Sequence, residues 1–313
     1  MQGSQRTVGR IIAAWGLMTV ACGFASAADN GVTLTSPGQG TTYPLAYKFT
    51  PGTFAHYEVT QKSVILSRYE QGQEKMNNES TTTKHFRVVT ADAAGVAQLE
   101  PIIDRVKMAV TFNDVNKVEY DSADPGPAPR GFEAVAATIG KSTARIHLTP
   151  NGELTKVTAL PDAPASLTAL AAKADPSMNF LIPLPREAVG IGAVWKDRYQ
   201  VPVVVGEGLS QPVTLQREFA LTKVTGAVAT ITFQTKIITP MDNPQVQAQL
   251  LQRTPAGTIE FDLDRGLIVA QTTKASGEVV QAFGANTKMQ ASLETTERLI
   301  PQTAGVQPAA LKQ

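Results

Sequence analysis

Cysteine is almost absent from this sequence: Cys22 is the single one among 313 residues, and it lies close to the N-terminus. One cysteine makes no internal disulfide and no thiolate cluster for a metal. Aromatic residues make up 6% of the chain. After the N-terminus, no apolar run approaches the roughly 18 residues that a membrane-spanning helix needs. We therefore expect a soluble mature protein without disulfides.

Excess charge and catalytic motifs are also lacking. The chain has 28 basic and 27 acidic residues, a balance that favours neither nucleic acid nor an anionic membrane as partner. It contains no Gly-x-Ser-x-Gly elbow, no His-Glu-x-x-His pair, no phosphate-binding glycine loop and no dinucleotide fingerprint. These absences predict a non-enzymatic protein that uses no cofactor.

The N-terminus has the features of a secretory signal. Two arginines precede the apolar run 11–21, and the small residues 25–27 suit a signal peptidase. We expect residues 1–27 to be removed and the protein to be secreted or periplasmic. A second route stays open, in which Cys22, preceded by Val-Ala, is acylated and anchors the chain to a membrane.

Alternating polar and apolar residues predict strands through most of the chain. The clearest run is 228–237, ten residues that alternate as in a strand with one face in water. Another long strand is expected at 287–299. Turn signals such as the Asn-Gly at 151–152 separate the runs, and no helical crossovers lie between them, which predicts antiparallel pairing.

Two parts of the chain resemble each other in three places and in the same order. The matched segments are 52–59 with 192–201, 86–99 with 219–231, and 146–154 with 261–268. Short helices predicted at 131–139 and 244–252 also fall at matching places. The fold class we expect is mainly β and antiparallel, with two tandem copies of a β-rich unit and short covering helices. The copies form two half-barrels or one larger sheet.

The expected organisation follows from these matches and from composition. It comprises a signal peptide at 1–27, a flexible N-terminal segment at 28–41, a first β-rich repeat at 42–160, a Pro-rich connector with a short helix at 161–184, a second repeat at 185–301 and a flexible tail at 302–313. The Pro-rich loop 123–130 is expected to be semi-rigid and exposed and has no counterpart in the second repeat, so it is a candidate for a specialised surface.

Candidate chemical groups are scattered in the sequence. His56, His85 and His147 fall in separate predicted strands without a common spacing motif, so we expect polar, solvent-facing side chains and no shared metal site. Asp104 and Asp197 are interpreted as lone charges on solvated strand faces. No catalytic, cofactor-binding or metal-binding residue is therefore predicted.

Aromatic residues recur at matching positions of the two halves. Recurrence of this kind is typical of a core. The alternative is that some of them line an apolar pocket between a curved sheet and its covering helices. The candidate lining residues are Tyr57, Phe86, Trp195, Tyr199 and Phe219.

Two motifs carry a family resemblance. Pro51-Gly52-x-Phe54-x-x-Tyr57-x-Val59, and the segment from Pro183 to Trp195 with its Val-Gly-x-Gly, resemble a family of uncharacterised secreted proteins found largely in planctomycete-type bacteria. The resemblance covers about residues 44–300 and implies no activity and no functional residue. In architecture alone, the expected fold is similar to the half-barrels of the periplasmic lipoprotein carrier LolA and the sensor RseB.

The leading functional hypothesis is a non-enzymatic protein that binds an apolar small molecule or lipid in the cell envelope. A structural or adaptor protein that docks an envelope protein through a sheet edge or loops is the alternative. A hydrolase that uses two carboxylates is a third. No nucleic-acid partner is expected, and membrane contact is expected only if Cys22 is acylated.

Overall fold

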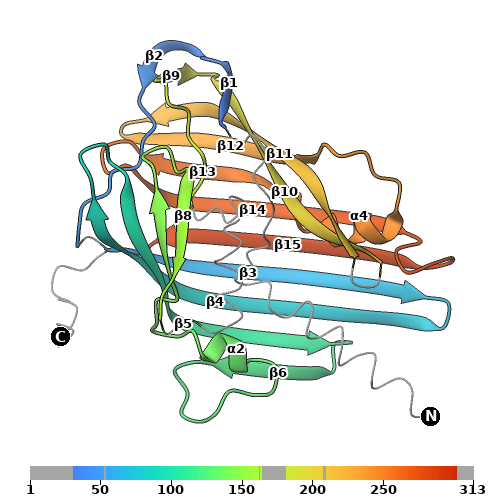
Figure 1. Ribbon diagram of the computed structural model, residues 1–313. Coiled ribbons are helices and arrows are strands. Elements are labelled where there is room, and N and C mark those ends of the chain that lie inside the picture. Colours follow the sequence, from blue (N-terminus) through green and yellow to red (C-terminus); the bar gives the residue numbers. More distant parts are fainter. Residues whose placement is uncertain (1–30, 53, 162, 164–180, 207–208, 302–313) are drawn as a thin grey trace.

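The computed structural model describes residues 31–52, 54–161, 163, 181–206 and 209–301 (Figure 1). The strands of this part are β1 (Thr33–Ser36), β2 (Gln39–Tyr43), β3 (Phe54–Tyr69), β4 (Gly72–Ala91), β5 (Ala97–Phe112), β6 (Asn116–Asp121), β7 (Ala144–Leu148), β8 (Leu154–Ala159), β9 (Val189–Ile191), β10 (Val194–Gly206), β11 (Leu209–Thr225), β12 (Val228–Ile237), β13 (Ala256–Asp262), β14 (Leu267–Val280) and β15 (Lys288–Leu299). The helices are α2 (Glu133–Ala136) and α4 (Pro244–Leu250). The expected mainly β, antiparallel fold class is confirmed.

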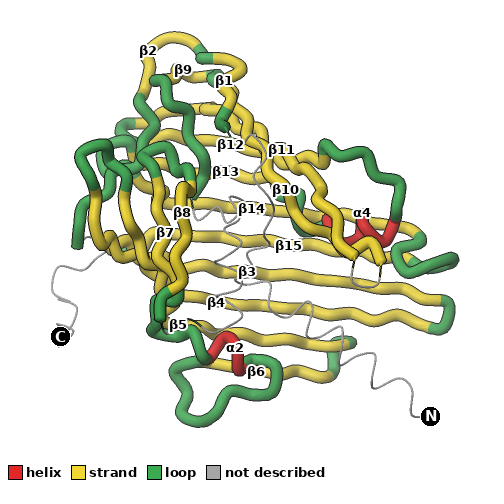
Figure 2. Tube along the Cα trace, viewed as in Figure 1, coloured by secondary structure: helices red, strands yellow, loops and turns green. Residues whose placement is uncertain are grey.

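Most strands belong to one continuous sheet. Its order is β1-β10-β11-β12-β13-β14-β15-β3-β4-β5-β7-β8, and β6 pairs with β5 beside this path. The sheet is open, because it begins at β1 and ends at β8 without pairing between them. β15 pairs with β3 along its whole length, so strands from both halves of the chain share one sheet. Figure 1 shows how strongly this sheet twists, and Figure 2 shows β7 and β8 in front of its middle strands.

Side chains alternate between two faces of the sheet, as they must in extended strands. We call the face that carries Trp195 and Tyr57 the inner face, and the face that carries their chain neighbours the outer face. Both of these residues are buried, at 0% and 4% exposed. The inner face therefore holds the main cores.

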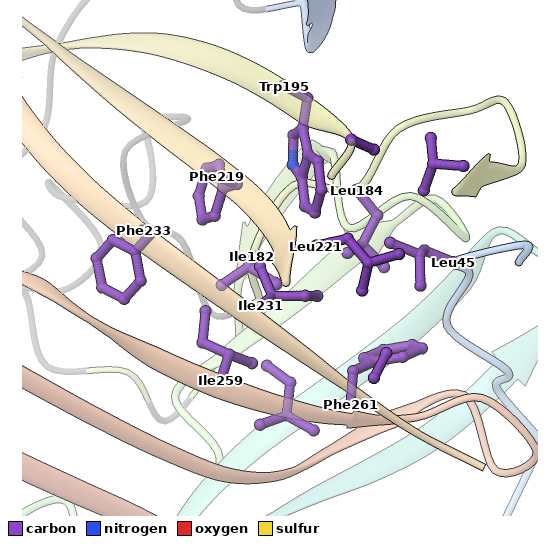
Figure 3. Packing of buried hydrophobic residues seen from close by; sticks show 14 of the residues in the cluster. Leu45, Ile182, Leu184, Trp195, Phe219, Leu221, Ile231, Phe233, Ile259 and Phe261 are labelled. Carbon is purple, nitrogen blue, oxygen red and sulfur yellow. The ribbon is translucent and has the colours of Figure 1, made fainter. Parts of the chain in front are cut away.

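The largest core lies where β10–β13 meet segments that connect strands (Figure 3). Trp195, Phe219 and Phe261 are fully buried there, together with Leu184. The indole Nε1 of Trp195 donates a hydrogen bond to the carbonyl oxygen of Pro183 at 2.9 Å. A buried N–H needs such a partner. The end of the expected connector is therefore part of the core rather than a simple spacer.

The two helices are short and cover the sheet at separate places (Figure 2). α4 begins at Pro244, and the side chain of Asn243 accepts a hydrogen bond from the Gln245 N–H at 2.9 Å, as an N-cap does. Its Val246 and Leu250 pack on β10 and β11, whereas Ala248 packs with residues of β14 and β15. α4 thus bridges two separated parts of the sheet.

Some expected boundaries differ from the structure. The segment 28–41 was expected to be flexible, and this is wrong for 33–41, because β1 pairs with β10 and β2 pairs with β9. Gly190 permits the second pairing, since a Cβ there would lie 2.4 Å from the Gln39 carbonyl oxygen. Short strands of this kind gain stability from the edge that they join, so they need little apolar pattern of their own. The helix expected at 131–139 is reduced to the single turn of α2.

Several expectations fall on residues outside the described part of the chain. These are the signal peptide at 1–27, the connector helix at 163–173 apart from residue 163, and the tail at 302–313. Among the residues that are described, no helix combines the length and the apolar character needed to cross a membrane.

Candidate functional site: a cavity beside β10 with a buried ion pair

Four of the five candidate lining residues lie inside packed cores. Trp195 and Phe219 stack with ring centroids 5.6 Å apart and are fully buried. Tyr57 and Phe86 meet edge to face with ring centroids 6.1 Å apart in a second cluster, built on β3, β4, β5, β7 and β8. The Tyr57 hydroxyl donates to the carbonyl oxygen of Ile268 at 3.1 Å, and burial raises its pKa well above the usual value. These rings hold strands together.

The fifth residue, Tyr199, lines a cavity of about 410 Å³ beside β10. The residues around this β10 cavity come from β1, the β7–β8 turn, the end of the connector and β10. Its apolar lining includes Val32, Leu34, Leu154, Pro183 and Leu184, and its polar lining includes Asn151, Glu153, Arg186, Glu187, Asp197 and Arg198. Because the strands involved are distant in sequence, the cavity exists only in the folded protein.

A buried ion pair forms part of the cavity wall. Asp197 and Arg217 face each other across β10 and β11, and their side chains are only 8% and 11% exposed. The guanidinium Nε lies 3.0 Å from Oδ1 of Asp197, and Nη2 donates to the other carboxylate oxygen. Asp197 is thus neither lone nor solvated as expected from the sequence, and that prediction is wrong.

Aromatic rings complete the surroundings of the ion pair. The guanidinium of Arg217 lies 4.9 Å from the Tyr199 ring centroid and 5.5 Å from that of Phe219. Burial lowers the pKa of Arg217, but the attraction of Asp197 outweighs it, so the pKa stays above its ordinary value. A cation held between a carboxylate and two ring faces is fixed in position. The cavity therefore has a rigid wall on its β10 side.

The charged groups of the cavity are less constrained elsewhere. Arg186 and Glu153 are 3.5 Å apart and 78% and 50% exposed. Arg198 donates from Nε to the Gln216 side-chain oxygen at 2.9 Å. Exposed pairs of this kind contribute little to stability and rearrange easily. The cavity thus combines apolar side chains with movable charges of both signs, which suits a molecule with an apolar body and a polar end.

The structure also brings together groups that the sequence had left apart. His56 and His85 are direct cross-strand neighbours on the outer face, and Asp104 contacts His85. Asp104 is therefore not a lone charge, and that expectation is wrong. The two histidines are neighbours, which their spacing in the sequence did not indicate. Burial lowers the pKa of His56, and His85 lowers it further. Pairing of Tyr69 with Gly72 at the β3–β4 turn fixes the register, so locating that turn in the sequence would have revealed the pair.

Comparisons with known proteins show no family. No family model matches the chain, and no curated protein matches it. Among solved structures, DynF from the dynemicin biosynthesis pathway of Micromonospora chersina matches with 8% identity over 90% of this chain and 92% of that one, at a TM-score of 0.21. The translocator domain of the autotransporter NalP from Neisseria meningitidis matches with 8% identity over 94% and 95%, also at 0.21. Scores this low carry no argument about function.

Proposed function

We propose that this protein is a non-enzymatic binding protein of the cell envelope that holds an amphiphilic small molecule, such as a lipid, in the β10 cavity. The main observation behind this proposal is the cavity itself. Its volume of about 410 Å³ falls in the range of roughly 300–1,000 Å³ typical of small-molecule sites. Leu34, Leu154 and Leu184 supply an apolar lining of the kind that such sites use.

The charges support an amphiphile rather than a purely apolar ligand. Arg186 and Arg198 border the cavity beside Glu153 and Glu187, so the anionic part of a polar head group would meet the arginines, while Tyr199 and the leucines would contact its chain. Asp197 already accepts two hydrogen bonds from Arg217, so its charge is neutralised inside the protein. The proposed location in the envelope rests on the signal-like N-terminus and is a separate proposal.

The first test is native mass spectrometry of the protein purified from its own cell envelope, before and after solvent extraction. A bound molecule of defined mass that is lost on extraction is the expected result, and its mass would identify its chemical class. The same spectrum reports whether the chain starts at residue 28 or at an acylated Cys22. A clean apoprotein mass before extraction would contradict the proposal.

Variants locate the site. Leu34→Trp and Leu154→Trp fill the cavity from two different strands, and we expect each to weaken binding of dodecanoic acid at least tenfold. Val280→Trp is the matched control, because Val280 is 63% exposed on β14 and does not line the cavity. Equal affinities in all three variants, with melting temperatures like that of the original chain, would exclude this cavity as the site.

The open sheet favours docking of a partner protein as a second candidate. β1 and β8 lie at its two ends, and edge strands pair readily with added strands. The loop 123–130 between β6 and α2 is mostly exposed and adds a distinctive surface. Replacing it with a glycine linker should abolish capture of an envelope partner and preserve the melting temperature. Unchanged capture would exclude the loop as the docking surface.

A further inference from the structure

We propose that His56, His85 and Asp104 form a binding site for a divalent transition-metal ion on the outer face of the sheet. The site lies on β3, β4 and β5, and none of its residues lines the β10 cavity. It is therefore independent of the proposed ligand binding, and either proposal can fail without the other.

The three side chains already lie close together. The His56 and His85 rings stack with centroids 5.0 Å apart and planes inclined by 30°. Nδ1 of His85 lies 2.8 and 2.9 Å from the two carboxylate oxygens of Asp104. One ligand atom from each residue can be chosen so that all three lie within 4.8 Å of one another.

A break in the strand register brings Asp104 to this position. On β4 and β5, Lys84 pairs with Ile103 and the preceding Thr83 pairs with Arg105, so Asp104 has no partner of its own. This is a β-bulge, which inserts an extra residue and turns its side chain from the regular direction. Bulges are enriched beside functional sites. Here the extra residue is a carboxylate directed at a histidine.

The donor set matches the preferences of particular ions. Two imidazole nitrogens and one carboxylate oxygen suit Zn²⁺, Cu²⁺ and Ni²⁺, whereas Ca²⁺ and Mg²⁺ prefer oxygen ligands alone. A carboxylate that contacts the second nitrogen of a histidine also fixes the ring orientation, as in many metal sites. Asp104 can serve as the ligand or as the group that orients His85, and in both roles its loss weakens the site.

A metal ion can reach the site, and the nearby arginine does not compete with it for Asp104. The side chains of His85 and Asp104 are 14% and 35% exposed, so an ion can reach them and keep water in its remaining positions. The nearby cation Arg105 is held by Asp121, with nitrogen–oxygen distances of 3.0 and 2.7 Å. Tetrahedral zinc needs its ligand atoms about 3.3 Å apart. A separation of 4.8 Å closes to that value with less than about 2 Å of side-chain movement.

The test is a competition titration with Zn²⁺, using the full chain without a polyhistidine tag and with Cys22→Ser to remove its one thiol. We expect one ion per chain. His56→Gln, His85→Gln and Asp104→Asn should each raise the dissociation constant at least tenfold. His147→Gln is the matched control, because His147 lies on β7 away from the site, and its affinity should stay within about twofold of the original.

A second measurement needs no substitution at the site. The chain has three histidines, so zinc should shift the ring signals of two of them in an NMR spectrum and leave the third unchanged. Melting temperatures in EDTA identify any variant that fails to fold. Absence of zinc binding by the original chain, shifts of none or all of the histidine rings, or an equal loss in His147→Gln would overturn the proposal.

Discussion

The β3–β4 and β10–β11 strand pairs begin in the same way and carry different chemistry. The Gly52 N–H donates to the Val88 carbonyl oxygen at 2.8 Å, and the Gly192 N–H donates to the Leu221 carbonyl oxygen at 2.8 Å. Three residues after each glycine, a cross-strand partner faces a phenylalanine, Phe86 in one pair and Phe219 in the other. The two strand pairs therefore begin with the same backbone contact and carry a phenylalanine at the same cross-strand position.

Side chains at the next positions differ on both faces. On the outer face, His56 pairs with His85 where the other strand pair has Lys196 and Glu218, an ion pair of 2.9 Å. Glu218 also lies in uninterrupted register with β12, so no bulge adds a carboxylate there. The proposed metal-ligand residues are therefore present in the β3–β4 strand pair and have no counterparts in the β10–β11 pair.

The inner face shows the same contrast in a different form. Each strand pair holds a cation 5.5 Å from the centroid of its phenylalanine, Lys84 over Phe86 and Arg217 over Phe219. Arg217 is paired with a buried aspartate, whereas Lys84 pairs with the partly exposed Glu297 at 3.0 Å. One backbone plan thus supports a deeply buried ion pair in one half and an accessible one in the other.

The largest predicted effect is a difference in how much the two ion pairs contribute to the free energy of unfolding. Asp197→Ala leaves the Arg217 guanidinium buried without its carboxylate, so we expect the free energy of unfolding to fall by about 3–5 kcal/mol. Lys84→Ala breaks a pair whose members are 27% and 22% exposed and should cost about 1 kcal/mol or less. Urea denaturation monitored by tryptophan fluorescence measures both.

A double variant checks the cause of that difference. Asp197→Leu together with Arg217→Met removes both charges, and apolar replacement of a buried pair is often close to neutral. Most of the stability lost in Asp197→Ala should therefore return. If the double variant is as unstable as the single one, packing rather than the unpaired charge sets the cost.

A smaller effect concerns Tyr57, which occupies the position that Asp197 has in the other strand pair. Tyr57→Phe removes a buried hydrogen bond to Ile268 and should cost about 1–2 kcal/mol. The pKa of Tyr57 is raised in the folded state, mainly by burial. Its contribution is therefore complete below the unfolded pKa of about 10 and is lost as the pH rises through the folded-state pKa.

Measuring the free energy of unfolding at alkaline pH tests whether the contribution of Tyr57 decreases as the pH rises. Between pH 9 and pH 11, the original chain should lose stability more steeply than Tyr57→Phe. Tyr47 is a second test of the same effect, because it is also buried, its hydroxyl donates to the Ile182 carbonyl oxygen at 3.1 Å, and its pKa is raised by burial. Tyr47→Phe should flatten the curve in the same way, and identical slopes in all three proteins would contradict the assignment.

The strand pattern in the sequence was sufficient for the fold class but not for every position. The strand expected at 228–237 has the same bounds as β12. Ten alternating residues determine which side chains point to the inner face and which to the outer face. Matching segment 52–59 with 192–201 places Tyr57 opposite Tyr199, whereas counting from Gly52 and Gly192 places Tyr57 at the position of Asp197. A shift of two residues keeps each side chain on its face, so alternation alone does not detect it.

The candidate sites were harder to predict, for two physical reasons. Residues around the β10 cavity come from four segments, and only tertiary packing brings Leu34 beside Leu154 and Tyr199. The pairing of His56 with His85 depends on the exact turn between two long strands. Asp104 depends in addition on a bulge, which alternation obscures because the extra residue changes the phase of β5.

The smallest effect comes from transferring the histidines to the other strand pair. Lys196→His with Glu218→His replaces an ion pair whose side chains are 34% and 31% exposed, so stability should change by less than about 1 kcal/mol. Zinc should bind this new pair at least tenfold more weakly than the His56–His85 pair, because β12 offers no bulged aspartate. A zinc titration of the variant measures both sites together. Adding His56→Gln weakens the original site, so that the affinity of the transferred histidine pair can be measured by itself. Equal affinity would show that two cross-strand histidines suffice and that the bulge at Asp104 contributes nothing to metal binding.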